Sequence, residues 1–357
     1  MSAACWGSSR SPRPAGYRQL VSWLRSHGEL TLVGVEGTGS YGVGLSRYLA
    51  RAGVAVVEVD RPNRQTRHRK GKSDPVDAVA AARAALSGQA TGLPKTRDGN
   101  VEAIRVLGIA RRSAVDTRIE TLNQLRHVVF TATPEIRAKF TGLTAISLAN
   151  KASSLRPRQS DDPVRYTTLV TIRALGQRVQ YLREETKRLN RLLRPLIRDT
   201  APGLLEVFGV GFDTAAKLLV AAGDNPERIR SEGAFAHLCG VAPIPASSGK
   251  TDRHRLNRGG NRQANSALFH VVITRMRHDQ ATRDYVARRL AEGKTMGEVA
   301  RILKTLRRPG SLQTAAQTRL TPPCRGLAHT NRLTPSGCAT NDLPTPTRHP
   351  TPGRAMV

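Results

Sequence analysis

The chain has 357 residues, enough for two ordinary domains, and carries 57 Lys and Arg against 27 Asp and Glu. The net charge of +30 favours salt-dependent binding of polyanions such as nucleic acid. Aromatic residues make up only 4%, which argues against base stacking on an aromatic sheet as the binding mode. The four cysteines include no C-x-x-C pair, which argues against a disulfide framework or a zinc site. Without a long apolar run or a signal peptide, we expect a cytoplasmic protein with no membrane partner.

An atypical N-terminal segment, residues 1–29, precedes a predicted β-α-β unit in residues 30–97. The unit begins with an apolar strand that ends at Glu36, followed by a glycine-rich turn and a helix to about residue 52. A β-branched run at 54–60 predicts a second, buried strand.

The next segment, residues 61–72, carries six Arg and Lys residues and predicts a loop that binds a polyanion. Its candidate phosphate contacts are Arg64, Arg67, Arg69, Lys70 and Lys72. A helix is predicted directly after this loop, because Asp74 suits the N-cap, Pro75 the first helical position and Asp77 the third.

Two long helices are predicted in residues 98–198. The first covers 101–130, with one apolar side formed by Ile104, Leu107, Val115, Ile119, Leu122 and Val129. The second covers 169–196 and carries a heptad seam, typical of a coiled coil, made of Ile172, Leu175, Val179, Leu182, Thr186, Leu189, Leu193 and Leu196. The seam leaves two options open, because the helices can pair with each other or each with a second subunit.

A mostly helical domain is predicted in residues 199–304. Around Gly209 and Gly211 the pattern is helix, tight turn and helix, which resembles a helix-hairpin-helix that binds a DNA phosphate through backbone N–H groups. Lys217 on the second helix is a further candidate contact. Residues 305–357 contain eight prolines and one acid without apolar periodicity, and predict a disordered tail.

A dinucleotide site is one interpretation of the glycine-rich turn. The stretch 37–42 matches G-x-G-x-x-G after a strand, and Asp60 ends the next strand, where a ribose-binding acid would lie. Three observations oppose NAD binding: only two strands are predicted, the following 200 residues are helical and basic, and Glu36 would repel a pyrophosphate. A NAD-binding enzyme therefore stays as the lesser alternative.

A magnesium site is the second interpretation of this region. Phosphoryl transfer by metal ions needs several carboxylates that converge from separate elements, and Glu36, Asp74 and Asp77 meet that requirement in outline. The simpler reading is that Asp74 and Asp77 cap a helix while Glu36 is an ordinary loop acid. Spacing alone leaves both readings open.

A serine nucleophile is a third candidate. Ser247 and Ser248 lie in a Ser- and Gly-rich loop among cations that could hold a phosphate: Lys250, Arg253, His254, Arg255 and Arg258. A solvated turn is the alternative, and His254 suits a phosphate contact better than a general base.

Five motifs in order resemble the insertion-sequence one-ten family of transposases: VEGTGSYG, GKSDPVDA, two long helices, GVGFDTAAKLL and GVAPIPASSGKTDRHRLNRGGN. The resemblance implies an α/β plus α protein: a ribonuclease-H-like (RuvC-like) domain, coiled-coil helices and a C-terminal domain with a catalytic serine. It implies RNA-guided DNA recombination with Mg²⁺. It assigns the metal to Glu36, Asp74 and Asp77 and the nucleophile to Ser248, with Ser247 as the alternative. It also implies DNA, a structured guide RNA and a homo-oligomer, dimer or tetramer, as partners.

The chain departs from this family at both ends. The family's first metal-binding aspartate lies on an opening strand before the glutamate, whereas the first aspartate here is Asp60. The last family helix should continue past Leu303, but the proline-rich tail begins at Thr305. We therefore expect an incomplete RuvC-like domain and a copy of doubtful activity, with a non-catalytic nucleic-acid-binding remnant as the alternative.

Overall fold

The computed structural model of the chain describes residues 14–59, 74–159, 162–246, 254–255, 257 and 259–305. The chain divides into two compact units, and the boundary lies between Thr96 and Arg97. No described helix combines the length and the apolar composition needed to cross a bilayer.

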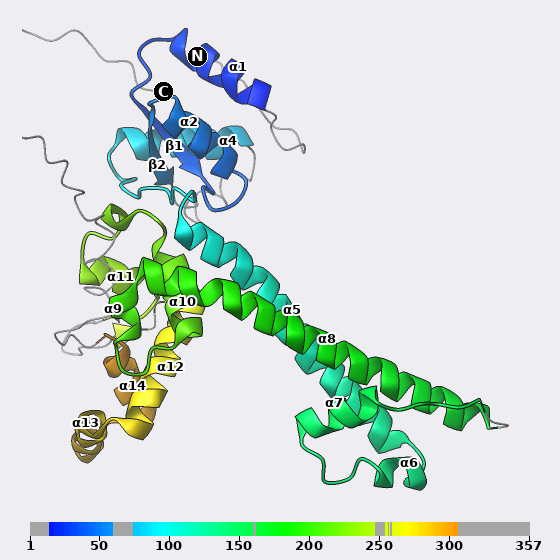
Figure 1. The fold of residues 1–357 in the computed structure, drawn as a ribbon. Coiled ribbons are helices and arrows are strands. Elements are labelled where there is room, and N and C mark those ends of the chain that lie inside the picture. The colour runs from blue at the N-terminus through cyan, green and yellow to red at the C-terminus, as the bar shows by residue number, and fades with distance from the viewer. Residues whose placement is uncertain are drawn as a thin grey trace, which may run out of the picture. The chain divides into compact units, whose positions relative to one another are not determined.

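The N-terminal unit is a small parallel sheet with helices on both faces (Figure 1). Its elements are α1 (Pro14–Arg25), β1 (Leu32–Glu36), α2 (Val43–Arg51), β2 (Ala55–Val59) and α4 (Asp74–Leu86). Strands β1 and β2 are parallel, with Val35 opposite Glu58 and Glu36 opposite Val59. The predicted β-α-β unit is therefore confirmed. The described part of residues 1–29 contains a helix and no strand.

The two faces of the sheet bind different helices. On one face, a core of Val21, Val35, Leu49 and Val54 joins α1 and α2 to β1. On the other face, Gly34 allows α4 to approach, because a Cβ at Gly34 would lie 2.7 Å from the carbonyl oxygen of Ala81. Since side chains alternate along a strand, Glu36 shares the face of Gly34.

Within its described residues, the second unit is helical apart from one short hairpin. Its helices are α5 (Asn100–Thr131), α6 (Pro134–Ala138), α7 (Ala145–Ser153), α8 (Pro163–Thr200), α9 (Pro202–Leu205), α10 (Phe212–Ala222), α11 (Glu232–Leu238), α12 (Arg262–His278), α13 (Gln280–Ala291) and α14 (Met296–Thr305). A 3₁₀ turn covers Pro226–Arg228, and β3 (Ile244–Pro245) pairs antiparallel with β4 (His254–Arg255).

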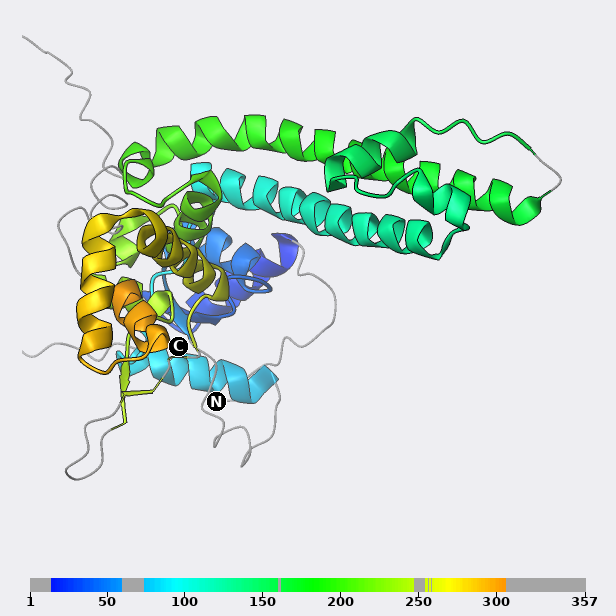
Figure 2. The same cartoon turned by 90° about the horizontal axis from the view of Figure 1, so that it is seen from below.

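Helices α5 and α8 lie side by side in opposite directions (Figures 1 and 2). At one end Leu125 packs in the same core as Ile172, and at the other Ile104 packs with Ile197. The predicted seam is buried at Ile172, Val179, Leu182 and Leu193. The seam therefore packs against a helix of the same chain, as in the first of the two options that its sequence left open.

The buried side of α5 differs from the predicted one at Ile119, which is 50% exposed. The buried stripe passes instead through Ala114, Thr121 and Leu125. Thr121 can lie in this interface because its hydroxyl donates to the carbonyl of Thr117 at 2.8 Å. Small and internally hydrogen-bonded side chains thus face α8, which simple apolar spacing does not reveal.

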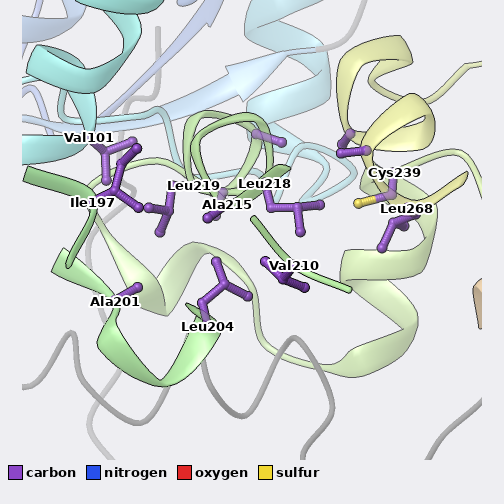
Figure 3. Packing of buried hydrophobic residues seen from close by; sticks show 14 of the residues in the cluster. Val101, Ile197, Ala201, Leu204, Val210, Ala215, Leu218, Leu219, Cys239 and Leu268 are labelled. Atoms are coloured by element: carbon purple, nitrogen blue, oxygen red, sulfur yellow. The ribbon is translucent and has the colours of Figure 1, made fainter. Parts of the chain in front are cut away.

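A core at the base of α5 and α8 joins both helices to the C-terminal segment (Figure 3). It contains Val101 and Ile197 from the long helices, Ala215 and Leu219 from α10, and Leu268 from α12. Residues 98–198 and 199–304 thus share one hydrophobic core and lie in one compact unit.

Candidate functional site

Glu36 and Asp77 lie in two elements that pack on each other, β1 and α4. Glu36 is the last residue of β1, and α4 begins beyond the end of the parallel strand β2. Helix α4 covers the face that Glu36 shares with Gly34, and Asp77 lies in its first turn, half-buried. The convergence of Glu36 and Asp77 at one edge of the sheet stays a prediction. Asp74 is the first residue of α4, but its side chain lies outside the described residues.

A further acid of this sheet, Glu58, is missed by motif spacing. It lies opposite Val35 in β2, so its side chain is on the face opposite that of Glu36. Its carboxylate accepts a short hydrogen bond from the hydroxyl of Thr38, which is buried in the glycine-rich turn. The only sequence signal for Glu58 is an acid inside an otherwise apolar strand. Glu58 fastens the turn to β2 and does not join the carboxylates on the face of α4.

Glu36 and Asp77 are the members of the predicted magnesium site whose side chains the structure describes. Glu36 and Asp77 offer carboxylate oxygens, the donors that Mg²⁺ prefers. Among the side chains that the structure describes, which exclude Asp60 and Asp74, no group of three Asp, Glu, His or Cys could hold a metal ion. The donor chemistry therefore fits a hard divalent cation. The third carboxylate of the predicted set, Asp74, has a side chain outside the described residues.

The glycine-rich turn is held together by backbone hydrogen bonds within the turn. The backbone N–H groups of Ser40 and Gly42 both donate to the carbonyl of Gly37, at 2.8 and 3.1 Å. Gly42 packs against the end of β1, because a Cβ there would lie 2.7 Å from the carbonyl oxygen of Glu36. A dinucleotide pyrophosphate is held by free N–H groups of such a turn. Two of these groups are already bonded here, which opposes the NAD interpretation.

The turn around Gly209 and Gly211 leads directly into α10. Gly209 has φ +89°, and a Cβ there would lie 3.2 Å from the carbonyl oxygen of Val271 in α12. Gly211 is the N-cap of α10, has no side-chain cap, and faces open space where a Cβ would project. The helix before the turn, α9, has only four residues. The start of α10 is therefore open at Gly211, and phosphate binding there, like the helix-hairpin-helix assignment, stays a prediction.

Lys217 is engaged within its own unit. Its Nζ donates to Asp213 at 2.6 Å, and Arg111 of α5 donates to the same carboxylate at 2.9 Å. Burial alone would raise the pKa of Asp213, but Lys217 and Arg111 outweigh it and hold that pKa below its ordinary value. Arg111 also donates to Asn190 of α8 at 2.7 Å. This network ties α5, α8 and α10 together, so a phosphate contact by Lys217 would compete with Asp213.

The loop with the candidate serines has a described base. Strands β3 and β4 pair Ile244 with Arg255 and Pro245 with His254. Below them, the backbone of Gly260 lies against that of Gly240, because a Cβ at Gly260 would lie 2.1 Å from the Gly240 nitrogen. Arg255 is exposed on β4. Both ends of the loop are thus held by direct backbone contacts.

Cys239, next to this base, is excluded as the nucleophile. Its side chain is completely buried in the core of Figure 3. Burial raises the pKa of the thiol to about 12, so the reactive thiolate is not populated at neutral pH. Cys239 is therefore a core residue rather than a candidate nucleophile.

Several predicted site residues lie outside the described part of the chain. They are Arg64, Arg67, Arg69, Lys70 and Lys72 of the basic loop, and Ser247, Ser248, Lys250, Arg253 and Arg258 around the serine loop. Asp60 and the side chain of His254 also lie outside it. Their roles stay predictions from the sequence.

Comparison with known proteins identifies two matching regions. Residues 8–134 match a family model of DEDD transposases of the IS110 type, described as "Transposase". Residues 201–287 match a model described as "Transposase IS116/IS110/IS902 family". A curated relative, the uncharacterized 43.6 kDa protein of insertion element IS110 from Streptomyces coelicolor, is 34% identical over 130 residues. That alignment covers 35% of this chain and 32% of the relative.

The matches fall on the two candidate sites. The first matched region includes the carboxylates Glu36 and Asp77, and the second includes the turn at Gly209 and the base of the serine loop. The chain therefore carries two separate regions of transposase type.

Proposed function

We propose, on the premise that residues 8–134 and 201–287 are transposase regions of the IS110 type, that this chain is a DNA transposase. One observation carries the proposal: each matched region contains one of the two candidate sites described above. These sites are the carboxylates Glu36 and Asp77, and the loop above Gly240 and Gly260 that carries the serines.

The proposed reaction starts at Ser248, with Ser247 as the alternative. The serine oxygen attacks the phosphorus of a DNA phosphodiester, so an oxygen–phosphorus bond to the protein forms while the bond to one sugar oxygen breaks. The serine proton leaves to a base, and the departing sugar oxygen takes up a proton. Attack by a second DNA hydroxyl on the serine-linked phosphate reverses the sequence and joins new ends. Lys250, Arg253, Arg255 and Arg258 would neutralise the phosphate charge.

The carboxylates Glu36, Asp74 and Asp77 are proposed to bind Mg²⁺. When bound, the ion would supply positive charge and Lewis acidity to a DNA phosphate. We infer that β1, β2 and α4 are part of a ribonuclease-H-like (RuvC-like) domain. The support is the parallel strand pair with an acid at the end of its first strand and acids at the start of a covering helix.

DNA, a structured guide RNA and a second copy of the chain are the proposed partners, in the cytoplasm. The net charge of +30 supports binding of nucleic acid, and the basic loop with Arg64, Arg67, Arg69, Lys70 and Lys72 is the proposed contact. Open space beyond Gly211 adds a place for a phosphate. Because the seam of α8 packs within the chain, a dimer or tetramer would use another surface.

A recombination assay with donor DNA, target DNA and the RNA encoded by the element tests this proposal. We expect a protein–DNA adduct that survives denaturation, its loss in Ser248→Ala, and severe loss of recombination in Asp77→Asn. Gln263→Glu, an exposed change on α12, serves as the control.

Two results would contradict the proposal or part of it. Salt-dependent DNA binding without any adduct would favour the non-catalytic remnant, and an adduct that persists in Ser248→Ala but not in Ser247→Ala would move the nucleophile to Ser247. Detectable NAD binding by calorimetry would reinstate the dinucleotide alternative.

A further inference from the structure

The side-chain amide of Asn265, on α12, makes three hydrogen bonds to three separate groups. Its Nδ2 donates to the carbonyl oxygens of Cys239 and Gly240, both at 3.1 Å. Its Oδ1 accepts from Lys304 Nζ on α14, at 3.1 Å. A carbonyl oxygen can only accept and an ammonium group can only donate, so these partners determine which way the amide points.

The two carbonyls lie where the chain enters the serine loop. Gly240, with φ +65°, ends the turn after α11, and the backbone of Gly260 lies against it where the chain returns. The N–H of Asn261 donates to the carbonyl of Leu238 at 2.7 Å. This bond closes the same base one residue after Gly260 and two residues before Gly240. We call residues 241–259 the serine hairpin. Its two ends are therefore held together at the point that Asn265 contacts.

Lys304 adds a contact from the last described helix. Its Nζ lies 4.9 Å from the centre of the Phe269 ring, one turn after Asn265 on α12. Burial, and to a smaller extent Arg301, lowers the pKa of Lys304. The amine is thus held in a partly desolvated position by Asn265 and the ring. A lysine that served only to keep the protein soluble would extend its amine into water.

We propose that Asn265 and Lys304 are positioning residues that set the base of the serine hairpin, and with it the place of Ser247 and Ser248. Lys304 fixes the amide of Asn265, and the amide in turn holds the carbonyls of Cys239 and Gly240. The effect on DNA chemistry rests on the proposed function, whereas the effect on the hairpin base does not.

Two substitutions test the contacts of Asn265 and of Lys304 separately. Asn265→Asp keeps the side-chain shape and can still accept from Lys304, but it has no N–H for the two carbonyls. Lys304→Met keeps an unbranched chain beside Phe269 and removes the donor. Lys304→Arg restores a donor and is the conservative rescue. Gln263→Glu makes the same amide-to-carboxylate change two residues away, on the exposed side of α12, and is the matched control.

Hydrogen exchange of the full chain is the first measurement, because it needs no activity. We expect the amide of Asn261 to exchange at least about tenfold faster in Asn265→Asp, because the hydrogen bonds to the carbonyls of Cys239 and Gly240 are both lost. We expect a smaller increase in Lys304→Met and wild-type exchange in Lys304→Arg and Gln263→Glu. Amides of α5 around Leu125, in a different core, should be unchanged in every variant.

The second measurement is the single-turnover rate of the protein–DNA adduct, with DNA affinity measured in parallel. A positioning role predicts at least a tenfold lower rate in Asn265→Asp and in Lys304→Met, an unchanged DNA Kd, and recovery in Lys304→Arg. Should Asn265→Asp fail to fold, Lys304→Met carries the test alone.

Each outcome decides one statement. Wild-type exchange at Asn261 in both variants would show that Asn265 and Lys304 do not hold the hairpin base. Faster exchange with a wild-type adduct rate would refute the positioning of the serines. If the wild-type chain forms no adduct, the proposed function fails. The exchange experiment still decides whether Asn265 and Lys304 hold the hairpin base.

Discussion

Asp224 caps the start of helix α5 from a position 123 residues later in the chain, since its Oδ1 accepts the N–H of Val101 at 2.8 Å. Its second oxygen accepts from the N–H of Glu102 at 3.1 Å. The local N-cap residue, Gly99, has no side chain to do this. Gly99 also makes the room, because a Cβ there would lie 2.4 Å from the Asp224 carboxylate. The loop after α10 therefore supplies the cap that α5 lacks.

Replacing Asp224 with Ala should destabilise the second unit by about 1 kcal/mol, the usual effect of losing a helix cap. Two backbone N–H groups of α5 would lose their acceptor at a half-buried site. Urea unfolding followed by circular dichroism measures the change. Asp98→Ala removes an exposed acid two residues before α5 and is the control. Equal losses in the two variants would show that charge near the helix end, rather than capping, is responsible.

Gly34→Ala should separate α4 from β1. The new methyl would lie 2.7 Å from the carbonyl oxygen of Ala81, so the helix must shift and the unit should lose about 1–3 kcal/mol. If Asp77 and Glu36 bind one metal ion as proposed, the shift of α4 also lowers metal-dependent recombination. Exchange of the β1 and β2 amides reports the structural effect. In Gly92→Ala the methyl meets nothing nearer than 3.4 Å, so a similar loss there would contradict this explanation.

Gly176→Ala should weaken the contact between α7 and α8. A Cβ at Gly176 would lie 2.6 Å from the Ala152 Cβ and from the Ser153 backbone nitrogen, so we expect a loss of about 1–3 kcal/mol. Gly108, in the interior of α5, has nothing within 4 Å of such a Cβ. Gly108→Ala should therefore stabilise by up to about 1 kcal/mol through helix propensity. Thermal unfolding of both variants checks this, and effects of the same sign would refute it.

Asp213→Asn should change how stability depends on pH. The pKa of Asp213 is lower in the folded chain, so the ionised group stabilises the fold above its unfolded pKa of about 3.9. That contribution is lost as pH falls through the lower, folded pKa. The wild type should exceed Asp213→Asn by at most about 1 kcal/mol at neutral pH, since the carboxylate is half-exposed, and the difference should vanish in acid. Asp116→Asn, an exposed change on α5, should show no such convergence.

Much of the fold follows from local pattern. The β-branched run before Asp60 predicted β2, and a heptad seam predicted the long helix that became α8. Which side of each helix is buried was harder to predict. In α5, Ile119 is exposed while Ala114 and Thr121 are buried, and the last two residues carry no strong apolar signal. For the carboxylates, the sequence predicted the elements that carry Glu36 and Asp77, a strand end and the first turn of a helix, and the structure has both. That the two side chains converge stays a prediction.

By itself, the sequence determined the types of the elements, the basic character of the surface and the acids and hydroxyls available for chemistry. These properties depend on spacing over a few residues and on composition. Only the tertiary structure decided that the seam of α8 faces α5, that Lys217 is paired with Asp213, and that Glu58 lies on the face away from Glu36. It also decided that Asp224 caps α5 and that Asn265 hydrogen-bonds both Gly240 and Lys304. Those relationships join residues 4 to 123 positions apart, and most depend on how whole helices and strands pack, which no local periodicity encodes.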